Sequence, residues 1–128
     1  WFSGSVTQYD VIRFFAIDGA KTKNGGRVVA NRCAMKYHER SMAIEGDEVV
    51  YPDAHTAYLE RDESTMMESI VEGVKYTVAA SGTRVSNGDE IIDAGQQMSA
   101  MIRLANGEIT CGYFDPEEIE LLKAAGKI

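Results

Sequence analysis

The stretch VIRFFAIDGAKTKNGGRVVA, residues 11–30, decides the fold class. Residues 11–17 form a β-branched and aromatic run that ends at Asp18-Gly19, and residues 27–30 form a second apolar run. Between them, Asn24 and the paired glycines that follow it tolerate positive φ at little cost, so residues 21–26 predict a tight turn. Strand, turn and returning strand are typical of antiparallel β structure.

The same rhythm of short strands and turns continues along most of the chain. Short strands joined by tight turns favour an all-β meander or a barrel-like cone over a βαβ unit. Residues 58–73 are charged and Met-rich, and we expect an inserted loop there with one helical turn. The predicted strands are 11–17, 27–30, 34–37, 42–45, 48–51, 74–79, 90–92, 98–104 and 109–114.

The end of the chain changes to a helical pattern. Asp115 is a candidate N-cap, Pro116 suits the first helical position, and Glu118 completes a capping box. Gly126 provides a stop. We therefore predict a helix at 116–125 within a C-terminal segment 115–128. A helix of about ten residues is marginal in water, so its apolar face must dock on the β domain or on another surface.

Composition limits the classes of partner. With 128 residues the chain has room for one compact domain. The formal net charge is −7 and the pI is near 4.8, whereas nucleic acid and anionic membranes require clustered Lys and Arg. Nucleic acid is therefore an unsuitable partner. No uncharged apolar run approaches the roughly 18 residues of a membrane-spanning helix, so we expect no stable membrane insertion.

Two cysteines far apart in sequence, and no visible secretory signal peptide, favour synthesis in the cytoplasm. The opening residues 1–5, Trp-Phe-Ser-Gly-Ser, read as a cloning scar.

Catalytic motifs do not appear in the sequence, which contains no phosphate-binding glycine loop, HExxH pair or G-x-S-x-G elbow. The cysteines and histidines are Cys33, His38, His55 and Cys111. Zinc prefers four such ligands, but no two of these residues form a Cys-x-x-Cys or His-x-x-x-His pair. Two buried thiols and two solvated imidazoles are the alternative that the spacing leaves open. We expect no enzymatic activity.

Three stretches together resemble the PAAR family of spike-tip proteins. Residues 14–29 are similar to the first repeat of that family, with the Gly and Asp of its G-D-x-T-x-x-G-G motif transposed and Asn24 where many members carry His. Residues 38–47 are similar to its hairpin N-G-K-P-x-A-R-x-G-D, with Ala43 and Gly46-Asp47 kept. Residues 107–112 are similar to its closing G-D-K-x-x-C-G.

The resemblance implies a mainly β domain over residues 6–114, a compact cone of short hairpins in pseudo-threefold arrangement. Such a cone caps the end of a trimeric VgrG-like β-helical spike, one monomer per trimer, in a contractile injection machine. The protein would leave the cell on the spike, and effector proteins are further candidate partners. In this family the loops after the Gly-Asp signals gather at the apex, which implies that 23–24, 52–56 and 110–112 meet there. Zinc is the implied cofactor, with His55, Cys111 and then Cys33 as its ligands.

Two other readings stay open. A small cytoplasmic toxin-immunity protein, or another protein-binding module, would use an acidic surface against a basic partner. A metal-dependent hydrolase using His55 would need an open coordination position and a cleft. For the spike-tip reading, we predict that Phe15, Val28, Met42, Ala43 and Val49 contribute to the core or to the base that meets the spike.

Overall fold

A computed structural model describes residues 8–128 of the chain. Residues 1–7, and with them the stretch that reads as a cloning scar, lie outside the described residues. The strands are β1 (Tyr9–Phe14), β2 (Lys21–Thr22), β3 (Arg27–Val29), β4 (Lys36–Tyr37), β5 (Arg40–Ser41), β6 (Glu48–Val50), β7 (Thr56–Tyr58), β8 (Glu68–Val71), β9 (Val74–Thr77), β10 (Ile91–Asp93), β11 (Ser99–Leu104) and β12 (Ile109–Tyr113). The helices are the 3-10 turn η2 (Glu63–Thr65) and α1 (Pro116–Ala124).

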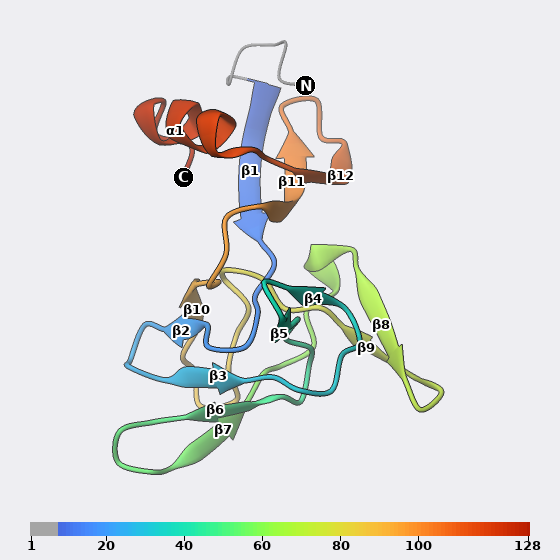
Figure 1. The fold of residues 1–128 in the computed structure, drawn as a ribbon, viewed down its shortest axis with the longest axis vertical. Coiled ribbons are helices and arrows are strands. Elements are labelled where there is room, and N and C mark those ends of the chain that lie inside the picture. The colour runs from blue at the N-terminus through green and yellow to red at the C-terminus, as the bar shows by residue number, and fades with distance from the viewer. Residues whose placement is uncertain (1–7) are drawn as a thin grey trace.

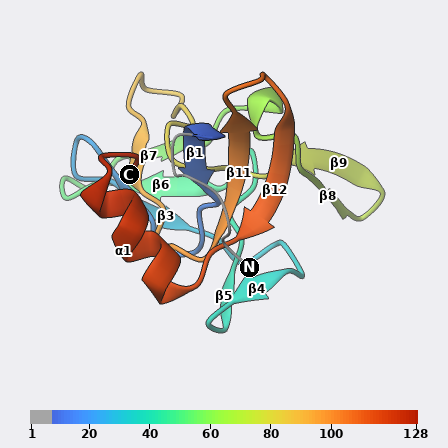
Figure 2. The same cartoon turned by 90° about the horizontal axis from the view of Figure 1, so that it is seen from above.

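The chain is mainly β, with small antiparallel sheets and one α-helix at the C-terminal end of the described residues, as predicted. Figure 1 shows two parts along the long axis, one built from β1, β11, β12 and α1, and the other from the shorter strands. Seen along that axis, the β4–β5 and β8–β9 hairpins project from the periphery in different directions (Figure 2). The chain enters the second part at the end of β1 and leaves it after β10.

The first part is a three-stranded antiparallel sheet in the order β1-β11-β12, with α1 packed against it. Ile119 and Leu122 of the helix are buried in the same cluster as Tyr9, Phe14 and Phe114. The two rings of Tyr9 and Phe114 meet edge to face at 5.8 Å. The predicted docking of a short amphipathic helix is therefore confirmed, and the helix begins at the predicted capping box of Asp115 and Glu118.

The second part contains a ladder that closes on itself. Its five strands follow the order β10-β2-β3-β6-β7. An isolated bridge between Leu59 and Val85 joins the end of β7 to residues 84–86, and a bridge between Arg84 and Glu90 joins that segment to the start of β10. The ladder thus runs through three consecutive hairpins and returns to β2, which leaves no long free edge within it.

Three alanines lie at the centre of this part and form a closed cycle of backbone hydrogen bonds. The N–H of Ala16 donates to the carbonyl of Ala79, that of Ala79 to Ala43, and that of Ala43 to Ala16, each over 2.9 Å. The three side chains are at most 1% exposed. Because three backbones approach each other this closely, only a small side chain fits at each position.

Three further backbone hydrogen bonds link the same three segments in the opposite sense, each from a residue two positions after one alanine to a residue two positions before another. Here Asp18 donates to Ser41, Glu45 to Thr77, and Ser81 to Phe14, over 2.8–2.9 Å. In each segment the next residue is a glycine with positive φ, namely Gly19 (90°), Gly46 (85°) and Gly82 (89°). An L side chain rarely adopts this conformation, so the glycines allow all three segments to make the same turn.

The predicted core residues Phe15, Val28, Met42, Ala43 and Val49 are all at most 1% exposed, which confirms their burial. Two predictions about secondary structure are wrong. Residues 42–45 form no strand, because they pair through single bridges to Ile17 and Val78 rather than through a continuous ladder. The segment 58–73 is not a plain inserted loop: besides η2 it contains β8, which pairs with β9 over four residues.

The period-2 pattern of β8 is hidden by its exposed face. Ile70 is 66% exposed, and the turn at Glu72-Gly73 has positive φ at both residues, as a type I′ hairpin requires. The sequence in this region therefore contains a hairpin signal that its high charge obscures. The strands β2, β5 and β7 were not predicted either, and β2 falls in the stretch 21–26 that was predicted as a turn.

Candidate functional site at the hairpin tips

The three hairpins of the closed ladder end in turns of one geometry. The hydrogen bonds that close them run from Gly25 to Thr22, from Ala54 to Tyr51, and from Gly88 to Val85. The donor residue has positive φ in each turn, at 87°, 71° and 90° respectively. Ala54 adopts this conformation although it has a side chain, so the second turn carries a backbone strain that the two glycine turns avoid.

The three tips meet around one buried carboxylate, that of Asp89, which is 2% exposed. From the first hairpin, the N–H of Asn24 donates to Asp89 Oδ1 over 3.1 Å. From the second, the hydroxyl of Tyr51 donates to Asp89 Oδ2 over 2.7 Å. Within the third hairpin, the N–H of Glu90 donates to Oδ1 over 2.8 Å. One side chain therefore accepts hydrogen bonds from all three hairpins.

These contacts change the acidity of both partners. Burial alone would disfavour the charged carboxylate, but hydrogen bonds from Thr22 and Tyr51 outweigh it and lower the pKa of Asp89. Burial, together with the hydrogen bond to Asp89, raises the pKa of Tyr51. The pair is therefore a phenol donating to a carboxylate, the arrangement with the stronger hydrogen bond.

His55, one of the three residues expected to bind zinc, lies in the turn between β6 and β7. Its Nδ1 lies within hydrogen-bond distance of Asp53 Oδ1, and its Nε2 lies 3.5 Å from Nδ2 of Asn87. The imidazole stacks on the ring of Tyr51, with centroids 4.2 Å apart and planes 5° from parallel. His55 thus supports the tyrosine that holds Asp89.

The structure does not bring the other two predicted zinc ligands to this site. Cys111 lies in β12, paired with Met101 of β11, and Figure 1 shows that sheet at the opposite end of the molecule from the β6–β7 turn. Cys33 is buried, with its sulfur 3.3 Å from the hydroxyl of Ser69. His38, the remaining histidine, lies in the β4–β5 turn.

The residues present therefore do not fit a shared zinc site. Among residues 8–128, no group of three or more His, Cys, Asp and Glu side chains is arranged to hold a metal ion. Zinc requires nitrogen at about 2.0–2.1 Å and sulfur at about 2.3 Å, which residues at opposite ends of the molecule cannot provide together. Cys111 is an exposed residue of β12, but the neighbouring atoms remove some water from its thiol, and this desolvation raises the pKa of the thiol.

Of the three loops that the resemblance places together, 23–24 contacts Asp89 and 52–56 contacts Asn87 through His55, whereas 110–112 lies in β12. The third loop at these tips is therefore 87–89. A signal for this loop is present in the sequence. Residues 16–28 and 79–91 share one spacing: Ala, then Gly three positions later, a basic residue two further on, Asn-Gly three after that, and a β-branched residue at the end. The Asn-Gly at 87–88 is the turn of the third hairpin.

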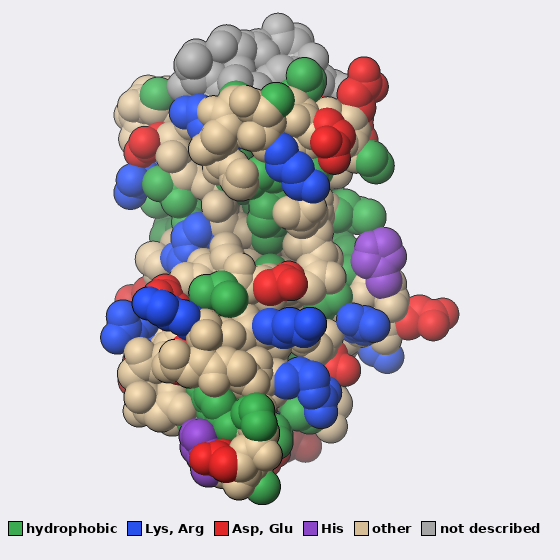
Figure 3. All heavy atoms as spheres, turned by 90° about the vertical axis from the view of Figure 1, so that its left-hand side faces the viewer, with side chains coloured by type: hydrophobic (Ala, Val, Ile, Leu, Met, Phe, Trp, Pro, Cys, Tyr) green, Lys and Arg blue, Asp and Glu red, His purple; other side chains and the backbone are tan. Residues whose placement is uncertain are grey.

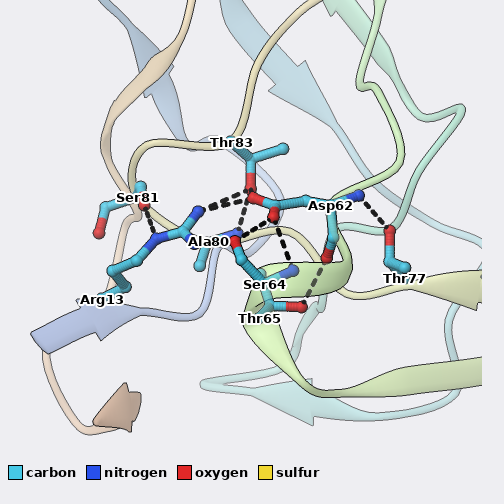
Figure 4. A network of polar contacts seen from close by, with 8 residues as sticks. All are labelled: Arg13, Asp62, Ser64, Thr65, Thr77, Ala80, Ser81 and Thr83. Carbon is cyan, nitrogen blue, oxygen red and sulfur yellow. Dashed lines mark hydrogen bonds and ion pairs between the residues drawn. The ribbon is translucent and has the colours of Figure 1, made fainter. Parts of the chain in front are cut away.

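A second polar network fastens β1 to the ladder (Figure 4). Arg13 donates through Nη2 to Asp62 Oδ2 over 2.6 Å and through Nε to the carbonyl of Ser81 over 2.7 Å. Thr83 also donates to Asp62 Oδ2, over 2.7 Å, and accepts from the N–H of Ala80. The network joins the 58–73 segment to β1 through Arg13 and to residues 80–83 through Thr83. These contacts hold the charged segment against the core.

The Asp62 carboxylate is mostly buried in this network. Burial would raise its pKa, but hydrogen bonds from Ser64, Arg13 and Thr83 outweigh that effect and lower the pKa. The arginine and carboxylate side chains are 17% and 15% exposed. Both charges are thus paired and hydrogen-bonded, as burial of a charge requires.

The surface offers one large hollow between the two parts, with a volume of about 820 Å³. Its lining mixes the basic Lys21 and Arg40 with Asp93, Gln96 and Ile92. On the face drawn in Figure 3, Lys and Arg side chains gather across the middle of the molecule, and hydrophobic side chains form small separate groups. Within the described residues, no helix has the length and apolar character needed to cross a bilayer.

Comparisons of the chain with protein-family models, with curated proteins and with solved structures find no match. Function must therefore be inferred from the geometry of the three repeated segments and their tips.

Proposed function

We propose that this protein is a structural, non-catalytic spike tip that caps the end of a trimeric VgrG-like β-helical spike in a contractile injection machine. The observation that carries the proposal is the closed cycle of hydrogen bonds among Ala16, Ala43 and Ala79. Three segments of one chain make the same contacts and the same turns around this cycle. A single chain that meets three identical chains needs three similar faces, and three repeated segments supply them.

The closed ladder supports the cone that the sequence resemblance implies. Bridges at Leu59–Val85 and Arg84–Glu90 join its first and last hairpins, and the three tips converge on Asp89. Hairpins that are paired at both sides and joined at their tips taper in one direction. We infer a pseudo-threefold cone whose apex is formed by the tips and whose broad side faces the spike.

The broad side would carry one arm for each repeated segment. β1, β5 and β9 lead directly into the three alanine segments, and each pairs with a neighbouring strand, β11, β4 and β8 respectively. On the β8–β9 arm, Ile70 is 66% and Val74 is 51% exposed. Apolar side chains and strand edges on such arms suit the end of a β-helix, which itself presents unpaired backbone groups and apolar rungs.

The test is capture of a trimeric β-helical spike protein by the purified chain, with the stoichiometry measured by native mass spectrometry. One chain per trimer is expected. The substitutions Ile70→Glu and Val74→Glu should weaken capture at least tenfold, because they place charge where apolar contact is expected. Alanines at the exposed tip residues Lys23 and His55 should leave capture unchanged, since the tips point away from the spike.

Failure to bind any trimeric β-helix, or equal weakening by the arm and tip variants, would refute the cap. A one-to-one complex with a basic partner would instead support the reading as a toxin-immunity or other protein-binding module.

A further inference from the structure

We propose that the Asp89 carboxylate is the internal fastener of the three hairpin tips, so that this apex holds its shape without a metal ion. The inference goes beyond the cap function and does not depend on it, because it concerns how the tips hold together in the free chain. The sequence resemblance implies a zinc site formed by His55, Cys111 and Cys33, but of these three residues the structure places only His55 at the tips.

Each of the three hairpins supplies a hydrogen-bond donor to Asp89. Asn24 supplies a backbone N–H, Tyr51 a side-chain hydroxyl, and Glu90 the N–H of the hairpin that carries Asp89 itself. Asn87 closes the same turn by accepting from the N–H of Asp89 over 3.1 Å. A carboxylate has about four acceptor positions, and these donors from three hairpins fill at least three of them.

The position of Tyr51 is set by packing as well as by its hydrogen bond. A Cβ built on Gly26 would lie 2.8 Å from Cζ of Tyr51 and 2.6 Å from Oγ1 of Thr22. The ring therefore lies where any larger residue at position 26 would place its side chain, and it stacks on His55. The hydroxyl is thus aimed at Asp89 before any bond forms, which reduces the entropy lost in making it.

A metal ion would need lone pairs that this arrangement already uses. Asp89 Oδ1 accepts from Asn24 and Glu90, Oδ2 accepts from Tyr51, and Nδ1 of His55 lies within hydrogen-bond distance of Asp53. The tips contribute one histidine and no cysteine. Zinc sites in proteins usually take three or four nitrogen or sulfur ligands, so coordination here would require the fastening to come apart. The Asp89 carboxylate therefore joins the three tips through hydrogen bonds, in the way that a zinc ion would join them through coordinating side chains.

The experiment uses the full chain and two matched variants, Asp89→Ala and Asp53→Ala. Both remove an aspartate from the tips, but Asp53 is exposed and bonds only within its own turn. In thermal unfolding, the Tm of Asp89→Ala should lie at least about 5 °C below that of Asp53→Ala, because Asn24 and Tyr51 lose their hydrogen-bond acceptor. The Tm of the wild-type chain should stay within about 1 °C on addition of EDTA or of zinc chloride.

Amide hydrogen exchange gives a local readout. The N–H of Asn24 lies in an exposed turn and donates only to Asp89, so its exchange in the wild-type chain should be slowed at least tenfold and should become fast in Asp89→Ala. Should Asp89→Ala not fold, Tyr51→Phe removes one donor alone and should speed this exchange less. A wild-type Tm that EDTA lowers by more than about 5 °C, or stoichiometric zinc in metal analysis, would overturn the proposal. Equal stability of the two aspartate variants would overturn it as well.

Discussion

Replacement of Gly26 by alanine tests how closely the first two hairpins pack. Gly26 is buried at the end of the β2–β3 turn, and its backbone does not require positive φ. An added Cβ would lie 2.6 Å from Oγ1 of Thr22, 2.7 Å from Cγ1 of Val49 and 2.8 Å from Cζ of Tyr51. All three separations are well below the roughly 3.5–4.0 Å of an ordinary contact.

The loss of stability expected for Gly26→Ala depends on whether these neighbouring side chains can move away from the added Cβ. Val49 is fully buried in the closed ladder, and Tyr51 is held between Asp89 and His55, so neither side chain can yield without loss elsewhere. Overpacking of a well-filled site costs about 1–3 kcal/mol, and the three simultaneous contacts put Gly26→Ala near the upper end. For a chain of this size, about 2–3 kcal/mol lowers Tm by roughly 6–15 °C.

Gly112→Ala is the matched control. Its backbone likewise needs no positive φ, and the added Cβ would meet one flexible atom, Cδ1 of Ile102, at 3.1 Å. Alanine in place of a strand glycine lowers the entropy of the unfolded chain, so this variant should stay within about 0.5 kcal/mol of the wild type. Chemical denaturation followed by circular dichroism measures both values. If Gly26→Ala matched Gly112→Ala in stability, the packing of the first hairpin against the second would be refuted.

Three further predictions concern the core, the charged network and the helix. Phe15→Ala should cost about 3–5 kcal/mol in denaturant unfolding, because the side chain is fully buried; a cost below about 1 kcal/mol would contradict its place in the core. The pKa of Asp62 is lowered in the folded chain, so its contribution to stability is present above the unfolded pKa of about 3.9 and is lost as pH falls through the folded value. Arg13→Met should flatten this acid dependence between about pH 5 and pH 2, and an unchanged pH profile would count against the pair. Asp115→Ala should cost about 0.5–2 kcal/mol through loss of the capping box with Glu118, and unchanged helical circular dichroism and Tm would argue that α1 is held by docking alone.

The β class, the C-terminal helix and the main core positions could be predicted from the amino-acid sequence. Each of these depends on local chemistry: Asp115 caps the helix that follows it, and the runs at 11–17 and 98–104 are apolar enough to predict strands wherever they pack. Short strands such as β2 and β5 escaped prediction, since two residues carry no periodicity.

Which loops meet at the tips could not be predicted in this way and follows from the packing of the whole fold. The cycle of Ala16, Ala43 and Ala79 uses backbone N–H and carbonyl groups, which every residue carries except that proline lacks the N–H. The Ala-x-x-Gly spacing that the three segments share shows that they repeat, but it does not show which of them bond to one another. Once that cycle sets the order of the hairpins, Asn24, Tyr51 and Asp89 come together across 65 residues of sequence, while Cys111 is carried to the far sheet. The conformation of a turn depends on a few consecutive residues, so the sequence predicts it. Which turns contact one another depends on how the whole ladder closes.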